Sequence, residues 1–185
     1  MDFTLLLFTV LLLSATDKVV GMVSDAEVAS LIALYESTDG PNWVVNSNWL
    51  SGNPCTPGAE WFGLYEADDV RPCVDSIKSI SFRGNGLSGV LPNVFTPFLH
   101  LEILRFVDEK ISGQIPSSLF LPPRLHTLDI TNCAVTSTIP STIAFASQLT
   151  QLRLSNDPLT VRRRFYGTIP SAISRCTKLR EFLLE

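Results

Sequence analysis

Apolar residues recur in blocks of one design along residues 77–185. Each block opens with an apolar residue, continues with alternating apolar and polar positions, and ends in an Ile/Leu-Pro pair. The spacing is 24 residues from Pro92 to Pro116 and from Pro116 to Pro140, and 30 residues from Pro140 to Pro170. The opening residues keep the same period, with the same single long step: Ile77, Leu101, Leu125, Leu149 and Leu179. A fixed period of this size indicates a solenoid of stacked units.

Each unit begins with a pattern such as Leu101-x-x-Leu104-x-Phe106, which predicts a short strand with one buried face. The Ile-Pro step must be extended, because proline fixes its own φ and restricts the preceding residue. Stacked units place their strands in a parallel sheet. The position after the strand should bond backbone groups inside the bend. Asn85 and Cys133 suit this position, whereas Glu109 and Asp157 are expected to loosen their turns.

The units match L-x-x-L-x-L-x-x-N/C-x-L and add Gly-x-Ile-Pro, as at Gly113 to Pro116. This pattern resembles the 24-residue leucine-rich repeats of extracellular plant receptor and inhibitor ectodomains. The resemblance implies an α/β fold: a right-handed arc with short parallel strands on its concave face. We expect four repeats and a partial fifth over residues 77–185, with no cap at their end.

Residues 22–76 are predicted to cap the first repeat. Ser24 and Glu27 form a capping box, an apolar helical face follows, and Thr38 to Pro41 ends the helix. Three tryptophans then occur at Trp43, Trp49 and Trp61. This resembles the N-terminal cap of plant-type repeat ectodomains, and the segment from Leu31 to Trp43 is similar to the form in protist and algal repeat proteins. By that resemblance Cys55 and Cys73, which flank Trp61, form a disulfide.

Residues 1–21 are interpreted as a signal peptide. The run from Phe3 to Leu13 is apolar or Thr and too short to span a bilayer as a helix, although the segment before it holds Asp2 and no Lys or Arg. An uncleaved anchor or a core helix is the alternative. Secretion, or exposure at the cell surface, is the expected localisation, and it favours disulfides. Cys133 is expected as a buried thiol, and Cys176 has no obvious partner.

Composition fits a buried solenoid core: 45% of residues are hydrophobic, 17% are charged and the net charge is −4. No nucleic-acid binding is indicated. Candidates for chemistry are few, since only His100 and His126 occur. His126 could be paired with Asp129, yet no nucleophile is placed beside it, and a surface histidine is the alternative. The acidic run Glu66, Asp68, Asp69 and Asp75 lacks the spacing of a calcium loop, and the cysteines lack that of a zinc site. We therefore expect no enzyme activity, no metal and no cofactor.

The remaining candidates lie on the surface. Outward positions of the strands form two columns, of which the first is Ser81, Arg105, Asp129, Arg153 and Leu183, and the second Arg83, Val107, Thr131 and Ser155. We define the strand-face strip as the predicted ligand-binding residues of these columns: Arg83, Arg105, Val107, Asp129, Thr131, Arg153 and Ser155. A self-paired charge ladder is the alternative to recognition. A second candidate is the interruption of the period, where Arg162, Arg163, Arg164, Phe165 and Tyr166 are expected to project, as a binding loop or as a solvated loop or processing site.

The sequence thus predicts a secreted or cell-surface recognition module that binds a protein or peptide. A soluble inhibitor of secreted hydrolases is a second hypothesis, and an enzyme on a repeat scaffold a third. Because Leu179, Phe182 and Leu184 begin a fifth unit that then stops, we also expect a fragment of a receptor-like kinase ectodomain, with membrane attachment through a missing C-terminal part. If the chain does stop there, edge pairing into a dimer is the alternative; the oligomeric state is open.

Overall fold

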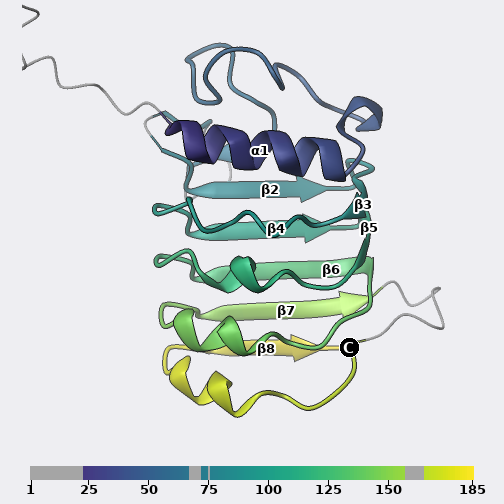
Figure 1. Cartoon of the computed structure of the whole chain (residues 1–185), viewed down its shortest axis with the longest axis vertical. Helices are drawn as coiled ribbons and strands as arrows, with labels where there is room; N and C mark the ends of the chain where they lie inside the picture. The colour runs from purple at the N-terminus through teal and green to yellow at the C-terminus, as the bar shows by residue number, and fades with distance from the viewer. Residues whose placement is uncertain (1–22, 67–71, 75, 157–164) are drawn as a thin grey trace, which may run out of the picture.

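The computed structural model describes residues 23–66, 72–74, 76–156 and 165–185. Its strands are stacked one above the other, from the helix α1 at one end to β8 at the other (Figure 1). Short antiparallel β1 (Leu64–Tyr65) pairs with the first of five parallel strands: β2 (Ser79–Arg83), β4 (Ile103–Val107), β6 (Thr127–Val135), β7 (Gln151–Asn156) and β8 (Glu181–Leu184). The predicted leucine-rich-repeat solenoid with a parallel sheet is confirmed.

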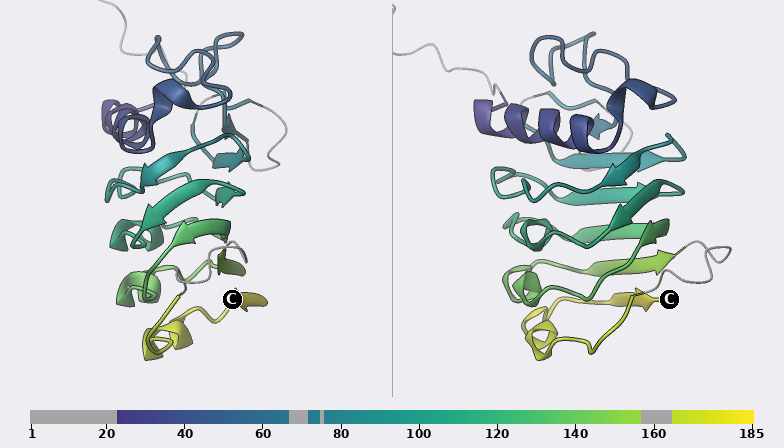
Figure 2. Two further views of the ribbon diagram at one scale, coloured as in Figure 1. Left: turned by 90° about the vertical axis from the view of Figure 1, so that its right-hand side faces the viewer. Right: turned by 45° about the vertical axis from the view of Figure 1, so that its right-hand side comes forward.

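A second, shorter ladder follows the first three of these parallel strands. It consists of β3 (Ser88–Val90), β5 (Lys110–Gly113) and the end of β6. After each Ile-Pro pair the chain turns into a 3-10 helix: η2 (Ser117–Phe120), η3 (Ser141–Phe145) and η4 (Ser171–Arg175). These helices lie on the side of the core opposite to the main sheet (Figure 2). Each begins directly after a proline in extended conformation, as the restricted φ of proline requires.

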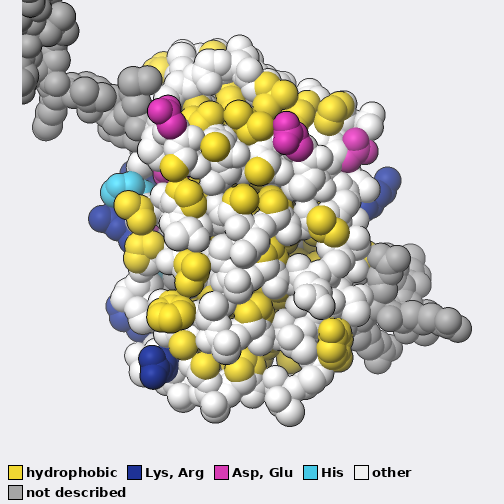
Figure 3. Space-filling model, in the orientation of Figure 1, with side chains coloured by type: hydrophobic (Ala, Val, Ile, Leu, Met, Phe, Trp, Pro, Cys, Tyr) yellow, Lys and Arg dark blue, Asp and Glu magenta, His cyan; other side chains and the backbone are white. Residues whose placement is uncertain are grey.

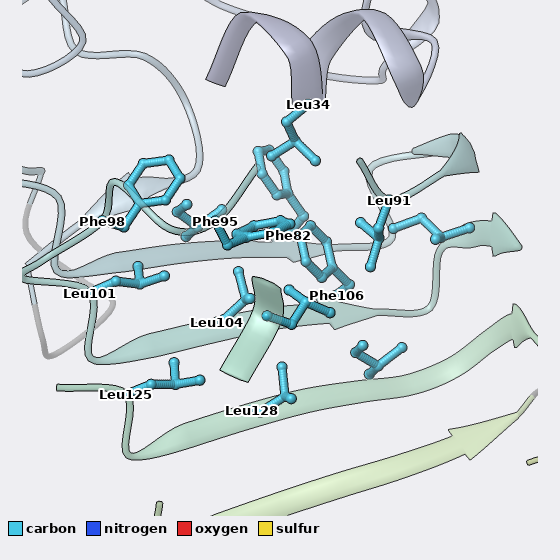
Figure 4. Packing of buried hydrophobic residues seen from close by; sticks show 14 of the residues in the cluster. Leu34, Phe82, Leu91, Phe95, Phe98, Leu101, Leu104, Phe106, Leu125 and Leu128 are labelled. Carbon is cyan, nitrogen blue, oxygen red and sulfur yellow. The ribbon is translucent and has the colours of Figure 1, made fainter. Parts of the chain in front are cut away.

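The helix α1 (Asp25–Ser37) covers the first repeat. Its capping box is present, since Glu27 N donates to Ser24 Oγ and Ser24 N to Glu27 Oε2. Leu31 and Leu34 are buried, and Figure 4 shows Leu34 reaching from α1 towards Phe82 of the first repeat. The short η1 (Gly40–Asn42) then leads into the tryptophan segment.

The three tryptophans close this end of the core. Their rings form a cluster, with Trp43–Trp49 and Trp49–Trp61 centroids each 4.9 Å apart, and Trp43 lies 5.0 Å from Phe82. Each indole N–H donates to a backbone carbonyl, for example Trp43 Nε1 to Thr38 O at 2.8 Å. The predicted Cys55–Cys73 disulfide is confirmed, with Cα atoms 5.1 Å apart.

A left-handed residue marks the bend after β2, the bend after β4 and the equivalent bend within β6. Gly84, Asp108 and Asn132 occupy equivalent positions with φ of 58°, 58° and 57°, a region that favours Gly, Asp and Asn. The next residue in each unit reaches the preceding unit. Asn85 bonds both backbone groups of Val45 through its side chain, and Cys133 is a buried thiol whose Sγ donates to Phe106 O.

The prediction that Glu109 loosens its turn is wrong. Instead of loosening its turn, its buried carboxylate accepts from Asn85 N and Leu87 N, both at 2.8 Å. The side chain is longer than Asn, and it therefore satisfies two amides of the preceding unit. Burial raises the pKa of Glu109, and the hydrogen bonds from the Asn85 and Leu87 amides oppose this. Asp157, expected to behave similarly, lies outside the described residues.

Candidate functional site

The first column of outward side chains is in register across all five parallel strands. Ser81, Arg105, Asp129, Arg153 and Leu183 are successive backbone partners. Neighbouring parallel strands lie about 4.8 Å apart, so that these side chains can touch. The predicted column is confirmed as geometry, and its role in binding stays a prediction.

Charges in this column are largely paired within the protein. Asp129 is 4% exposed, accepts from Thr131 Oγ1 and lies 3.6 Å from Arg153 Nη1. On the other side Arg153 Nε donates to Glu181 Oε1 at 2.5 Å, and Gln151 Nε2 donates to Glu181 Oε2 at 2.6 Å. The hydrogen bond to Glu181 raises the pKa of Arg153, and the bonds from Arg153 and Gln151 lower the pKa of Glu181. On β6, β7 and β8 the charged side chains of this face are therefore paired with one another within the protein.

The second column ends earlier than the sequence predicts. Arg83, Val107 and Thr131 are in register, but the pairing of β6 with β7 shifts between Ile130 and Cys133. Asn132, within β6, has a left-handed φ of 57°, whereas Asn156 at the same position in the next unit has no positive φ and pairs with Cys133. Ser155 is consequently not the partner of Thr131, and this part of the prediction is wrong.

Only some of the strand-face strip is accessible. Arg83 is exposed, and Arg105, Thr131 and Arg153 are partly exposed. In contrast, three of the predicted residues are at most 6% exposed: Val107, Asp129 and Ser155. A partner on this face would therefore meet mostly arginine and threonine side chains.

The interruption is described only in part, because Arg162, Arg163 and Arg164 lie outside the described residues. Phe165 differs from expectation, since it packs partly buried against the core. Tyr166 is 53% exposed, and its amide donates to Ser137 O at 3.0 Å. Of the two aromatics, Tyr166 is thus the one available to a ligand.

The structure also shows a hollow that the sequence analysis missed. It has a volume of about 510 Å³ and lies where the chain enters β4, β6, β7 and β8. Its polar lining comes from residues beside the opening leucines of successive repeats: Glu102, Arg124, His126, Gln148, Thr150 and Lys178. We call it the edge groove. Comparing the two residues that flank each opening leucine would have revealed it.

Among the described residues, no group of three His, Cys, Asp or Glu side chains is placed to hold a metal ion. No helix formed by the described residues is long and apolar enough to cross a membrane. His126 does not pair with Asp129 as a catalytic dyad would; its Nε2 lies 3.6 Å from Glu102 Oε2.

Comparison with known proteins places this geometry in a family. The chain is a leucine-rich-repeat protein by its fold. No family model matches the sequence. Protein STRUBBELIG-RECEPTOR FAMILY 1 of Arabidopsis thaliana is 34% identical over 125 residues, which is 67% of this chain and 14% of that protein. The chain therefore spans only a small part of this relative.

Solved structures agree with the sequence comparison. The crystal structure of PEPR1-AtPEP1 superposes with a TM-score of 0.69 at 25% identity, covering 86% of this chain and 21% of the other. The BIR2 ectodomain from Arabidopsis thaliana gives a TM-score of 0.67 at 26% identity, over 84% of this chain and 77% of the other. The chain is thus a leucine-rich-repeat domain of the plant receptor-like ectodomain type.

Proposed function

We propose that the protein is an extracellular recognition domain that binds a protein or peptide on its strand face without catalysis. The observation that carries this proposal is the first column, in which five strands present side chains in one register. Solenoids use such continuous surfaces for binding, since each unit adds one row of side chains. The similarity to the structure of PEPR1-AtPEP1 supports a recognition role.

The accessible members of the strip define the expected contacts. Arg83 offers a side chain that is 72% exposed and only 4.0 Å from Asp108 Oδ2, a weak ion pair. Arg105 and Thr131 lie beside it on the next strands. Arginine is a frequent binding hot spot, because its planar group forms several hydrogen bonds at once. Tyr166, which is 53% exposed, is a further candidate contact.

An extracellular location is part of the proposal. The Cys55–Cys73 disulfide supports it, since such bonds persist in oxidising compartments. Residues 1–21 would act as the signal peptide. Attachment to a membrane would come from the longer receptor to which such an ectodomain belongs.

The test is selective capture of secreted peptides and proteins. The immobilised domain is compared with a variant carrying Arg83→Gln and Arg105→Gln, and with Arg175→Glu, an equal change of two charges at an exposed position of η4. We expect a ligand retained by the wild type and by Arg175→Glu but lost from the strand-face variant. A ligand that all three proteins retain would place binding elsewhere. Inhibition of a secreted glycanase by the domain would instead favour the inhibitor hypothesis.

A further inference from the structure

We infer that the edge groove is a second binding site, for an acidic peptide segment in extended conformation. This goes beyond the proposed function, because the groove lies at the amino ends of the strands and contains no residue of the strand-face strip. Figure 3 shows Lys and Arg side chains and a histidine following one another along the left edge of the molecule, the side on which the strands begin in Figure 1.

The groove is built by the repeat itself. The amide of His126 donates to Glu102 O, that of Thr150 to His126 O, and that of Arg180 to Thr150 O, at 2.8–2.9 Å. These bonds keep the positions after the opening leucines in one row. A parallel row is formed by the residues before those leucines: Arg124, Gln148 and Lys178. Side chains of several repeats thus share one hollow of about 510 Å³.

Its cations are less neutralised than Arg153 of the strand face. Arg153 on the strand face is held between Asp129 and Glu181. In the groove, Lys178 Nζ donates to Gln148 Oε1 at 2.5 Å, and this amide oxygen carries no charge to neutralise the ammonium group. For Arg124, which is exposed, no hydrogen bond or ion pair occurs within the part of the chain that the structure describes. The one acid of the lining, Glu102, faces His126.

This arrangement fits carboxylates rather than apolar groups. A guanidinium can bind a carboxylate with two parallel hydrogen bonds, and an ammonium adds a point charge. Gln148 and Thr150 supply polar contacts between the two cations. Because Arg124 and Lys178 are two repeats apart, their backbones are separated by about 10 Å, twice the strand spacing. A polyproline II segment repeats its facing side chains every three residues, about 9.3 Å along the axis. The ligand pattern is therefore Asp/Glu-x-x-Asp/Glu.

The experiment uses the complete chain and a fluorescein-labelled proline-rich peptide with two glutamates in this spacing. Its matched control peptide carries glutamines instead. We expect the glutamate peptide to bind, and Arg124→Glu and Lys178→Glu each to weaken its Kd about tenfold, as expected for loss of a hydrogen bond between charged groups. Arg175→Glu, equal in charge change but outside the groove, should leave Kd unchanged.

Three outcomes would overturn the inference. These are equal binding of the glutamine peptide, equal weakening by Arg175→Glu, and no measurable binding of the glutamate peptide to the wild type. The variant Arg83→Glu distinguishes the groove from the strand face. It should leave the affinity for the glutamate peptide intact. If this variant weakened the peptide as much as Arg124→Glu does, the peptide would bind the strand face and the groove would not be a site.

Discussion

The first and the last described repeats differ in how far their apolar side chains are covered. At the first repeat, Phe82 is 1% exposed beneath the tryptophan cluster and α1. At β8, the equivalent apolar side chains are open, with Phe182 and Leu184 each 38% exposed and Ile169 49% exposed. Since each repeat contacts only its neighbours, a covered end should stabilise the whole stack, whereas an open end contributes little. Substitutions in the first repeat should therefore cost more stability than substitutions in β8.

Removal of Trp43, which packs directly on Phe82 of the first repeat, should have the largest effect. Trp43→Ala would leave a cavity between Tyr35, Trp49 and Phe82, and an aromatic deletion of this kind costs about 3–5 kcal/mol. Urea unfolding of the variant against the wild type measures this cost. Val44→Ala, an exposed neighbour at 74%, is the control and should change stability by less than about 0.5 kcal/mol. Equal losses would mean that the cap does not close the core.

Opening the disulfide should have the next largest effect. Cys55 and Cys73 are 18 residues apart, and a loop of this length is worth about 3 kcal/mol in the chain-entropy model. The double variant Cys55→Ser/Cys73→Ser should lower the free energy of unfolding by about that amount. Cys133→Ala would be a poor control for this variant, because removing a buried thiol also leaves a cavity. Burial also raises the pKa of Cys133 to about 12, so that this thiol should resist alkylation in the folded protein.

A third effect concerns the coupling of the first two repeats. Glu109→Ala would leave the amides of Asn85 and Leu87 without their acceptor, and such unsatisfied groups cost about 2 kcal/mol. Glu36→Ala on the exposed face of α1 is the matched control and should be near neutral. If the two variants were equally stable, water would be replacing the carboxylate, and the Glu109 side chain would not couple the two repeats.

Glu109 should also make the stability of the fold depend on pH. Because the folded-state pKa of Glu109 is raised above its ordinary 4.5, its protonation stabilises the fold below that pH, and this contribution is lost as the pH rises through the folded-state pKa. Glu181 acts in the opposite sense, since its pKa is lowered. The stability advantage of the wild type over Glu109→Gln should therefore be larger near pH 4 than near pH 7. An advantage that grew towards pH 7 would contradict this sign.

The fold could be predicted because its signal is repeated. The opening leucines and Ile-Pro pairs set the strands, the parallel order and the first column without knowledge of contacts. Glu109 escaped prediction, since its partners are backbone amides more than 20 residues earlier, at Asn85 and Leu87. The edge groove escaped it because its lining is drawn from single positions in different repeats, each unremarkable alone. The second column is interrupted before Ser155 because the left-handed φ of Asn132 has no counterpart one repeat later. A single backbone angle of this kind could not be predicted from the repeat pattern.

The smallest effect is expected at the open end. Phe182→Ala should cost less than about 1 kcal/mol, because a side chain already 38% exposed leaves little new cavity. Phe106→Ala, fully buried in the middle of the stack, should cost about 3–5 kcal/mol and serves as the matched comparison. If Phe182→Ala proved as costly as Phe106→Ala, β8 would be covered in solution. Sedimentation would then show whether a second copy provides the cover: association that Phe182→Ala weakens would make this end an interface.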